Sequence, residues 1–144
     1  MKIAIGGDHA GYEYKKLLIQ FIQDSLNHSI EDFGPFSLES VDYPDFVHPL
    51  CTELVKGKFD LGIVICGSGN GVAITANKHC HIRAALCFNT DVAQLARSHN
   101  DANVCAIPAR FLSISEVKNI VEVFLRSGFE GGRHVSRVGK ISMF

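Results

Sequence analysis

The most informative stretch of the sequence is Cys66-Gly67-Ser68-Gly69-Asn70-Gly71. Its closely spaced glycines leave several backbone N–H groups free to point at one spot, and such groups at the start of a helix bind an anion. The same surroundings favour the thiolate form of Cys66. A thiol phosphatase would need an arginine where Val72 stands, which argues against phosphate-ester hydrolysis. The alternative is that Cys66 is a small buried residue without chemistry.

A second segment whose residues could carry out chemistry is Gly6-Gly7-Asp8-His9-Ala10-Gly11. Its glycines allow a sharp turn and leave room for a ligand, and the adjacent Asp8 and His9 favour a functional site. The segment is not a Walker loop, because Tyr12 follows its last glycine, and it lacks the G-x-G-x-x-G spacing. A tight turn between a strand and a helix is the alternative.

Two further side chains are candidates. Arg110 follows Pro108-Ala109 directly after an apolar run, and an arginine that leaves a buried strand often meets a phosphate or a carboxylate. A plain surface arginine is the other interpretation. His99 lies one helical turn beyond Ala96 on an apolar stripe, where packed histidines are more common than catalytic ones.

Strands and helices must position these residues, and the hydrophobic pattern predicts both. Four apolar runs are typical of parallel strands buried on both faces, namely residues 2–6, 61–66, 83–88 and 103–107. A weaker run at 29–33 predicts an edge strand. Apolar stripes with helical spacing predict the helices, at residues 17–26, 46–55, 71–78, 90–99 and 117–125. A capping box, Ser113 to Glu116, precedes the last of them.

This alternation predicts an α/β fold, a Rossmann-like three-layer α/β/α arrangement with a five-stranded parallel sheet. No repeat or linker divides residues 1–144, so we expect a single domain. Ligands of such sheets bind at the carboxyl ends of the strands. Asp8 and Arg110 follow predicted strands and Cys66 ends one, so all three should lie at the same edge of the sheet.

The amino-acid composition and the net charge argue against some classes of function. The chain has 144 residues, 47% of them hydrophobic, and a formal net charge of −1, which argues against a general binder of nucleic acid or membrane surfaces. No apolar run approaches the roughly 20 residues that span a bilayer. Charge is uneven, because residues 131–144 carry +3 and the first 130 residues carry −4. We therefore expect a basic C-terminal tail from about residue 131, either solvated or holding a small anion.

The five cysteines favour a reducing compartment. Their number is odd and no C-x-x-C pair occurs, which predicts reduced thiols in a cytoplasmic protein and neither a disulfide framework nor a zinc site. His79 and His81 flank Cys80 with a spacing that suits a metal ion poorly. No metal is expected.

Taken together, the motifs resemble those of type B ribose-5-phosphate isomerases, in the superfamily that includes galactose-6-phosphate and allose-6-phosphate isomerases. The matching segments follow the family's order along the whole chain: Gly7-Asp8-His9-Ala10-Gly11, Asp42-Tyr43-Pro44, Ile65 to Gly71, Ala76-Asn77-Lys78, Ile82-Arg83-Ala84, Ser98-His99-Asn100-Asp101 and Glu130-Gly131-Gly132-Arg133-His134, with Arg137 after it.

The resemblance implies the interconversion of ribose 5-phosphate and ribulose 5-phosphate through an enediolate, in the pentose phosphate pathway and without a cofactor. It assigns Cys66 as the base that moves a proton between C1 and C2, and His99 as the group that opens the furanose ring. It gives the hydroxyl protons to Asp8 and Ser68. The remaining implied substrate contacts are Tyr43 at the sugar, the N–H groups of Gly67, Ser68, Gly69, Asn70 and Gly71 at the enediolate, Asn100, and a phosphate set of His9, Arg110, Arg133 and Arg137.

Two departures from the family pattern affect these assignments. A second branch of the family uses a glutamate directly after the glycine loop as the base, but Val72 stands there, so the sequence resembles the cysteine branch. Ser68 occupies a position that is often threonine and keeps the hydroxyl. The alternatives are a galactose-6-phosphate or allose-6-phosphate isomerase, alone or as a subunit, and a flavodoxin-like module that binds a mononucleotide.

The predicted geometry also bears on assembly. A helix after a strand runs back toward the opposite edge of the sheet, and ten helical residues span about 15 Å. His99 should therefore lie far from Cys66 of its own subunit, although the resemblance puts both in one site. We expect a homodimer with shared active sites, alone or as a dimer of dimers, in which His99 reaches the partner's cysteine. The subunit that supplies Arg110 stays open.

Overall fold

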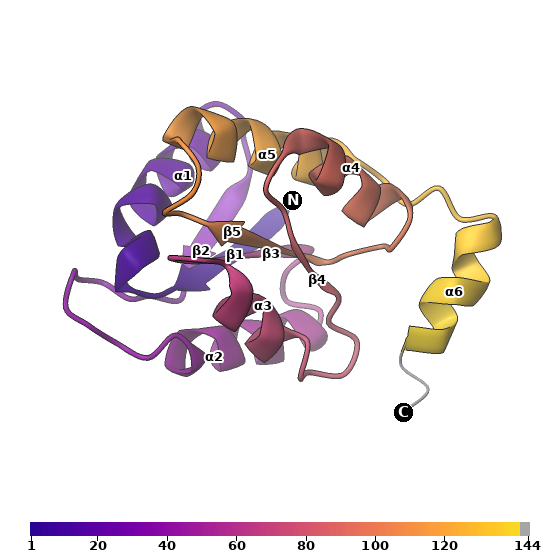
Figure 1. Ribbon diagram of the computed structural model, residues 1–144, viewed down its shortest axis with the longest axis horizontal. Coiled ribbons are helices and arrows are strands. Elements are labelled where there is room, and N and C mark those ends of the chain that lie inside the picture. The colour runs from indigo at the N-terminus through magenta and orange to yellow at the C-terminus, as the bar shows by residue number, and fades with distance from the viewer. Residues whose placement is uncertain (142–144) are drawn as a thin grey trace.

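Five strands form one parallel sheet in the computed structural model, which describes residues 1–141. The sheet order is β2-β1-β3-β5-β4. The strands are β1 (Lys2–Gly7), β2 (Ser29–Asp32), β3 (Leu61–Cys66), β4 (Ala84–Leu86) and β5 (Val104–Pro108). Helices cover both faces of the sheet (Figure 1), which confirms the predicted three-layer α/β/α fold.

The helices follow the predicted stripes with shifted ends. They are α1 (Tyr12–Asp24), α2 (Pro44–Val55), α3 (Asn70–Ala76), α4 (Thr90–Ser98), α5 (Ile114–Arg126) and α6 (Arg133–Ile141), with a short 3-10 turn at His9–Gly11. The predicted capping box at Ser113 and Glu116 is present. The Asn89 side chain accepts a hydrogen bond from the Val92 N–H and caps α4.

Two hydrophobic cores hold the central strands. One lies between the sheet and α1, α4 and α5, and the other lies between the sheet and α2 and α3. Ile63 and Ile65 of β3 face the first core, while Val64 and Cys66 face the second. Because successive side chains of a strand point to opposite faces, burial on both sides requires the unbroken apolar run seen in β3.

Strand β4 differs from its prediction. The run at 83–88 was expected to be buried on both faces, but the strand spans only Ala84–Leu86 and lies at an edge of the sheet with half-buried side chains. The predicted edge strand at 29–33 is correct, since β2 occupies the other edge. An apolar run therefore identified a strand at 83–88 but not its place in the sheet.

The predicted basic tail contains a helix that the sequence analysis did not predict, since residues 133–141 form α6. Residues 142–144 of the predicted tail lie outside the described residues. Helix α6 stands apart from the sheet and its covering helices (Figure 1), and His134 is its one buried residue within the described part. Among residues 1–141, no helix has both the length and the apolar character needed to cross a membrane.

Gly7 marks the closest approach of two strands. It pairs with Ile65 across β1 and β3, and the Asp8 N–H after it donates to the Ile65 carbonyl at 3.1 Å. A Cβ at Gly7 would lie 1.8 Å from that carbonyl oxygen, and one at Gly11 would meet the Ile65 side chain at 2.8 Å. Packing at the end of β1 therefore demands glycine at these positions, whatever ligand binds nearby.

We predict that Gly7→Ala lowers the free energy of unfolding by about 3 kcal/mol, because the added methyl forces β1 away from β3. Gly128→Ala is the matched control, since a Cβ there meets nothing within 4 Å. Urea denaturation of both variants measures the difference. Equal stability of the two variants would contradict the close-approach argument.

Candidate active site

The carboxyl ends of β1, β3 and β5 border one cavity of about 370 Å³. Its lining residues are Asp8, His9, Ala10, Tyr43, Cys66, Gly67, Ser68, Gly71 and Arg110. All of them except Ala10 are among the residues predicted from the sequence. The fold brings these side chains together from four separate parts of the chain, three of them at strand ends and Tyr43 at the start of α2, as expected for ligand sites of open α/β sheets.

A backbone N–H points at the cysteine sulfur. The Gly69 N–H donates to Cys66 Sγ at 3.1 Å, and the Asn70 N–H donates to Ser68 Oγ at 3.3 Å. Gly69 has a φ of +74°, and a Cβ there would lie 2.4 Å from the Leu86 side chain. Only glycine allows this turn, and the turn places a hydrogen-bond donor where negative charge on Sγ would be stabilised.

The other core cysteines lie in a different environment. Burial raises the pKa of the Cys51 thiol to about 12. Burial, together with a hydrogen bond to Cys87, raises the pKa of Cys105 well above its ordinary value. All five cysteines are free thiols, four of them buried, and Cys80 is the exposed one. Among the buried thiols, Cys66 is the one that borders the cavity at the strand ends.

Asp8 and His9 are held by backbone hydrogen bonds. Asp8 Oδ1 accepts from the N–H groups of Ala10 at 2.9 Å and Gly11 at 3.2 Å, so the carboxylate caps the 3-10 turn before α1. His9 Nδ1 accepts from the Val41 N–H at 3.2 Å, which leaves the ring proton on Nε2 as a donor. The capping role of Asp8 was missed, although an Asp before a helical segment is itself a capping signal.

Tyr43 and Arg110 lie on either side of the glycine loop. A Cβ on Gly71 would meet the Tyr43 ring at 2.5 Å, so glycine makes room for the tyrosine. A Cβ on Gly67 would lie 3.1 Å from Arg110 Nε, and the Arg110 N–H donates to the Gly67 carbonyl at 3.0 Å. The exposed guanidinium therefore stands over the loop and adds positive charge to the cavity.

A second group of predicted residues lies elsewhere. His99, Asn100, Arg133 and Arg137 do not line this cavity. The His99 ring stacks on the His134 ring with centroids 4.2 Å apart and planes 11° apart, and its Nε2 is 3.8 Å from Glu130 Oε2. Asn100 borders a separate cavity of about 220 Å³ beside Arg83 and Ile141. One subunit thus holds the predicted residues in two separate groups.

Glu130 and His134 received no role from the sequence, although both lie in a segment that matches the family. Desolvation, together with nearby His99, Arg133 and Arg137, lowers the pKa of His134 and favours its neutral form. Ligand atoms of His99, Glu130 and His134 lie within 4.8 Å of one another. Because the two rings are nearly parallel, a single ion cannot lie in both ring planes, so this stacked arrangement does not suit joint ligation of a metal.

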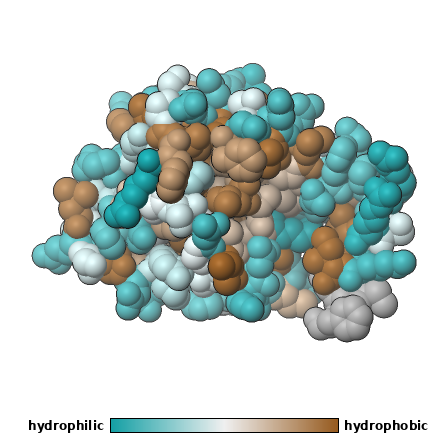
Figure 2. Space-filling model, viewed as in Figure 1, coloured by the Kyte–Doolittle hydropathy of each residue, from teal (hydrophilic) through white to brown (hydrophobic). Residues whose placement is uncertain are grey.

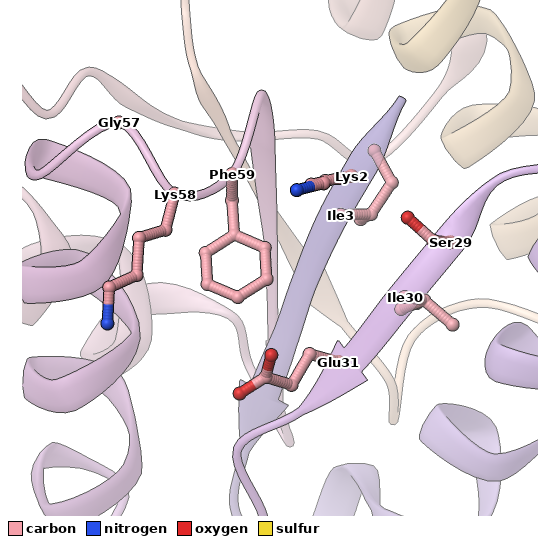
Figure 3. A pocket seen from close by; sticks show the side chains of 8 residues that line it. All are labelled: Lys2, Ile3, Ser29, Ile30, Glu31, Gly57, Lys58 and Phe59. Atoms are coloured by element: carbon pink, nitrogen blue, oxygen red, sulfur yellow. The ribbon is translucent and has the colours of Figure 1, made fainter.

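A larger cavity, about 430 Å³, lies at the opposite edge of the sheet (Figure 3). It is lined by the amino-terminal parts of β1 and β2 and by the segment before β3, and its side chains include Lys2, Glu31, Lys58 and Phe59. It contains neither the cysteine nor the glycine loop. Because ligands of parallel sheets bind at the carboxyl ends of strands, the smaller cavity is the candidate active site.

Comparison with known proteins agrees with this architecture. The model of the family described as Ribose/Galactose Isomerase matches residues 3–141 of this chain. A ribose 5-phosphate isomerase structure from Thermotoga maritima is 42% identical, with a TM-score of 0.96 over 99% of this chain and 98% of that one. Ribose-5-phosphate isomerase B from Clostridium thermocellum is 45% identical, with a TM-score of 0.96 over 99% and 95% of the two chains. Ribose-5-phosphate isomerase B of Escherichia coli is 39% identical over 98% of this chain and 94% of its own.

The protein belongs to the ribose/galactose isomerase family, since the match spans nearly all of its residues. Its closeness to type B ribose-5-phosphate isomerases in sequence and in structure identifies it as an aldose–ketose isomerase. The family resemblance inferred from the motifs is confirmed.

We predict that Asp8→Ala lowers the free energy of unfolding by about 1 kcal/mol, because the two capped N–H groups lose their acceptor. Asp8→Asn keeps an oxygen at the same place and serves as the matched control, with a loss of less than about 0.5 kcal/mol. Urea denaturation distinguishes the two variants. Equal destabilisation by both would show that the carboxylate charge, rather than the cap, stabilises the turn.

Proposed function

We propose that the protein interconverts ribose 5-phosphate and ribulose 5-phosphate through an enediolate. The observation that carries this proposal is the position of Cys66 Sγ, which lies at the cavity and accepts a hydrogen bond from the Gly69 N–H. We place the enzyme in the pentose phosphate pathway, in the cytoplasm. Its relatives with solved structures include several that carry the name ribose 5-phosphate isomerase.

The chemistry requires a base and a site for negative charge. Cys66 takes the proton from C2 of the open-chain aldose and returns it to C1, while Asp8 and Ser68 move the proton of the C2 hydroxyl to O1. The carbonyl thereby moves from C1 to C2 and no atom is gained or lost. A positioned base contributes about 10²–10⁴-fold to such a step. The backbone N–H groups of the loop from Gly67 to Gly71 hold the enediolate oxygen, and each such donor contributes about 10²–10³-fold.

Positive groups hold the distant phosphate. Arg110 stands over Gly67, and His9, whose Nδ1 accepts from Val41, lines the same cavity. Arg133 and Arg137 would complete the phosphate site from α6, where they lie one helical turn apart. Binding energy from a remote phosphate then positions the reacting carbons against Sγ.

We propose that the two groups of site residues meet across a two-fold dimer. Within one subunit His99, Asn100, Arg133 and Arg137 lie away from the cysteine cavity. Helix α6 stands apart from the body, and its Val135 and Ile141 are 57% and 55% exposed. Figure 2 shows apolar surface on the side of α6 that faces the body. A second copy would cover this surface and bring His99 to its Cys66 cavity.

A hexose 6-phosphate is the second candidate substrate, because the family description names both ribose and galactose isomerases. A relative from Rickettsia bellii, 40% identical over 96% of both chains, is named only as a sugar phosphate isomerase. Family membership replaces the flavodoxin-like module as an explanation of the fold.

An assay with ribose 5-phosphate, galactose 6-phosphate and allose 6-phosphate distinguishes the candidate substrates, and we expect the highest kcat/KM with ribose 5-phosphate. A higher value with either hexose phosphate would overturn the proposed substrate.

The first test concerns the thiol. We predict that Cys66→Ala lowers kcat for ribose 5-phosphate by at least about 10²-fold, because it removes the base, while inhibition by inorganic phosphate stays unchanged. Cys80→Ala, which removes an exposed thiol outside the cavity, is the matched control and should keep full activity. If the Cys66→Ala enzyme retains more than about a tenth of the wild-type kcat, another residue is the base.

The second test concerns shared sites. Subunits carrying Cys66→Ala and subunits carrying His99→Ala are inactive alone, but random mixing makes half of the dimers hybrids with one intact site each. We predict recovery of about a quarter of wild-type activity after subunit exchange. Exchange is verified by mass spectrometry of differently tagged chains. Verified hybrids without activity would place both residues in one subunit.

A further inference from the structure

The position of His99 at the end of α4 leaves its side chain free to change rotamer unless neighbouring groups hold it. It follows the last residue of α4 and its N–H donates to the Leu95 carbonyl at 2.9 Å. Two residues later Asp101 has a φ of +47°, so the chain turns sharply away. The imidazole is about one-third exposed. A side chain at such a turn samples several rotamers in solution, and fixing one of them requires neighbouring groups.

The backbone under His99 is firmly held. Arg83 Nη2 donates to Asp101 Oδ2 at 2.8 Å, and Arg97 Nη1 donates to the Ala102 carbonyl at 2.6 Å. Arg97 Nε also donates to the Ser127 carbonyl at 3.3 Å, which ties the chain after α5 to the end of α4. The orientation of the imidazole ring is therefore the main freedom left to His99.

Two residues lie against that ring, Glu130 from the segment between α5 and α6 and His134 from the first turn of α6. The His134 ring stacks face to face on His99, and Glu130 Oε2 approaches Nε2 at the ring edge. The Glu130 N–H donates to the Ser98 carbonyl at 3.0 Å, which docks the segment beside His99. Between them Gly131 and Gly132, with φ values of +70° and +56°, turn the chain so that His134 returns over the ring.

The burial of His134 is unusual for its helix. His134 is 8% exposed, while its neighbour Val135 is 57% exposed. Within the described residues of α6, it is the one side chain buried against its own subunit. The His99–His134 stack therefore buries one side chain of α6 against its own subunit, and its geometry is aromatic packing rather than a hydrogen bond through ring nitrogens.

We infer that His134 is a positioning residue that holds the plane of the His99 ring, with Glu130 at the ring edge, so that His99 Nε2 can move protons during opening of the sugar ring. The inference rests on the proposed isomerase function and on the role that the family resemblance implies for His99, which is to open the furanose ring. Ring opening removes the proton of the anomeric hydroxyl and protonates the ring oxygen, so the transfer atom must lie within hydrogen-bond reach of the sugar. A rotated imidazole loses that reach.

Comparing the rates in the two directions of the reaction distinguishes a role of His134 in ring opening from a role in phosphate binding or in general structure. Ribose 5-phosphate is cyclic in solution and must be opened. Ribulose 5-phosphate carries its phosphate on the oxygen that would close a furanose, so it is already acyclic, and the aldose formed from it can leave as the aldehyde and close in water. Damage to His99 positioning should therefore slow isomerisation of ribose 5-phosphate far more than isomerisation of ribulose 5-phosphate.

The kinetic test uses the full chain in both directions. His134→Ala should lower kcat from ribose 5-phosphate by about tenfold or more and change kcat from ribulose 5-phosphate by less than about threefold, with little change in either KM. His134→Phe keeps a flat ring for stacking and should restore the forward rate to within about threefold of wild type. His28→Ala, a histidine at the opposite edge of the sheet, is the matched control and should be unaffected.

Two kinetic outcomes would overturn the inference. A raised KM in both directions for both His134 variants would show that the His134 ring nitrogens bind the phosphate. An equal loss of kcat in both directions, not rescued by phenylalanine, would show a general structural role.

The stacking of His134 on His99 can be measured in the enzyme without substrate, which tests the inference independently of the proposed function. In the nuclear magnetic resonance spectrum the ring protons of His99, assigned with His99→Gln, should be shifted upfield by the stacked ring in wild type and in His134→Phe. The shift should disappear in His134→Ala. An unchanged His99 resonance in His134→Ala would show that the rings do not hold each other. Absence of wild-type turnover with ribose 5-phosphate would instead contradict the proposed function, and the resonance would still decide the stack.

Discussion

The hydrogen bond from the Gly69 N–H to Cys66 Sγ is the interaction on which the cysteine cavity depends. Cys66 is the last residue of β3 and pairs with Pro108 of β5, so the sheet itself sets the position of the sulfur. Gly69 can turn its N–H toward that sulfur because it has a positive φ and no side chain to strike Leu86. Rigid strand ends and one permissive residue thus create a thiol with a donor directed at it.

The loop and its neighbours form one packed unit. Tyr43 fills the space left by Gly71, and Arg110 fills the space left by Gly67. Each of these side chains comes from a different part of the chain, yet each needs a glycine opposite it. The glycines of the loop therefore serve both the backbone turn and the approach of the two side chains, and a larger residue at either position would displace part of the site.

The residues around His99 are held by other interactions than those of the cysteine cavity. The backbone after His99 is held by the arginine contacts at Asp101 and Ala102, while the His99 ring is held by aromatic packing from α6. Such a helix gains little stability from its own subunit, because few of its side chains are buried there. A dimer that covers α6 would stabilise the stack as well as complete the site, which links assembly to the orientation of His99.

The sequence alone determined the class of fold, because strands buried on both faces must be apolar throughout and helices must carry a stripe. It also identified the cysteine loop, Asp8, His9 and Arg110 as residues of one sheet edge, since parallel strands end on the same side. Local patterns did not show that β4 lies at an edge or that residues 133–141 form a helix, because edge position and docking depend on neighbours distant in the chain. The cap formed by Asp8 joins neighbouring residues and could have been predicted from the sequence. The structural reason for Gly7 and the stack of His134 on His99, in contrast, emerged only from the tertiary structure, since each is a contact whose partner no local spacing reveals.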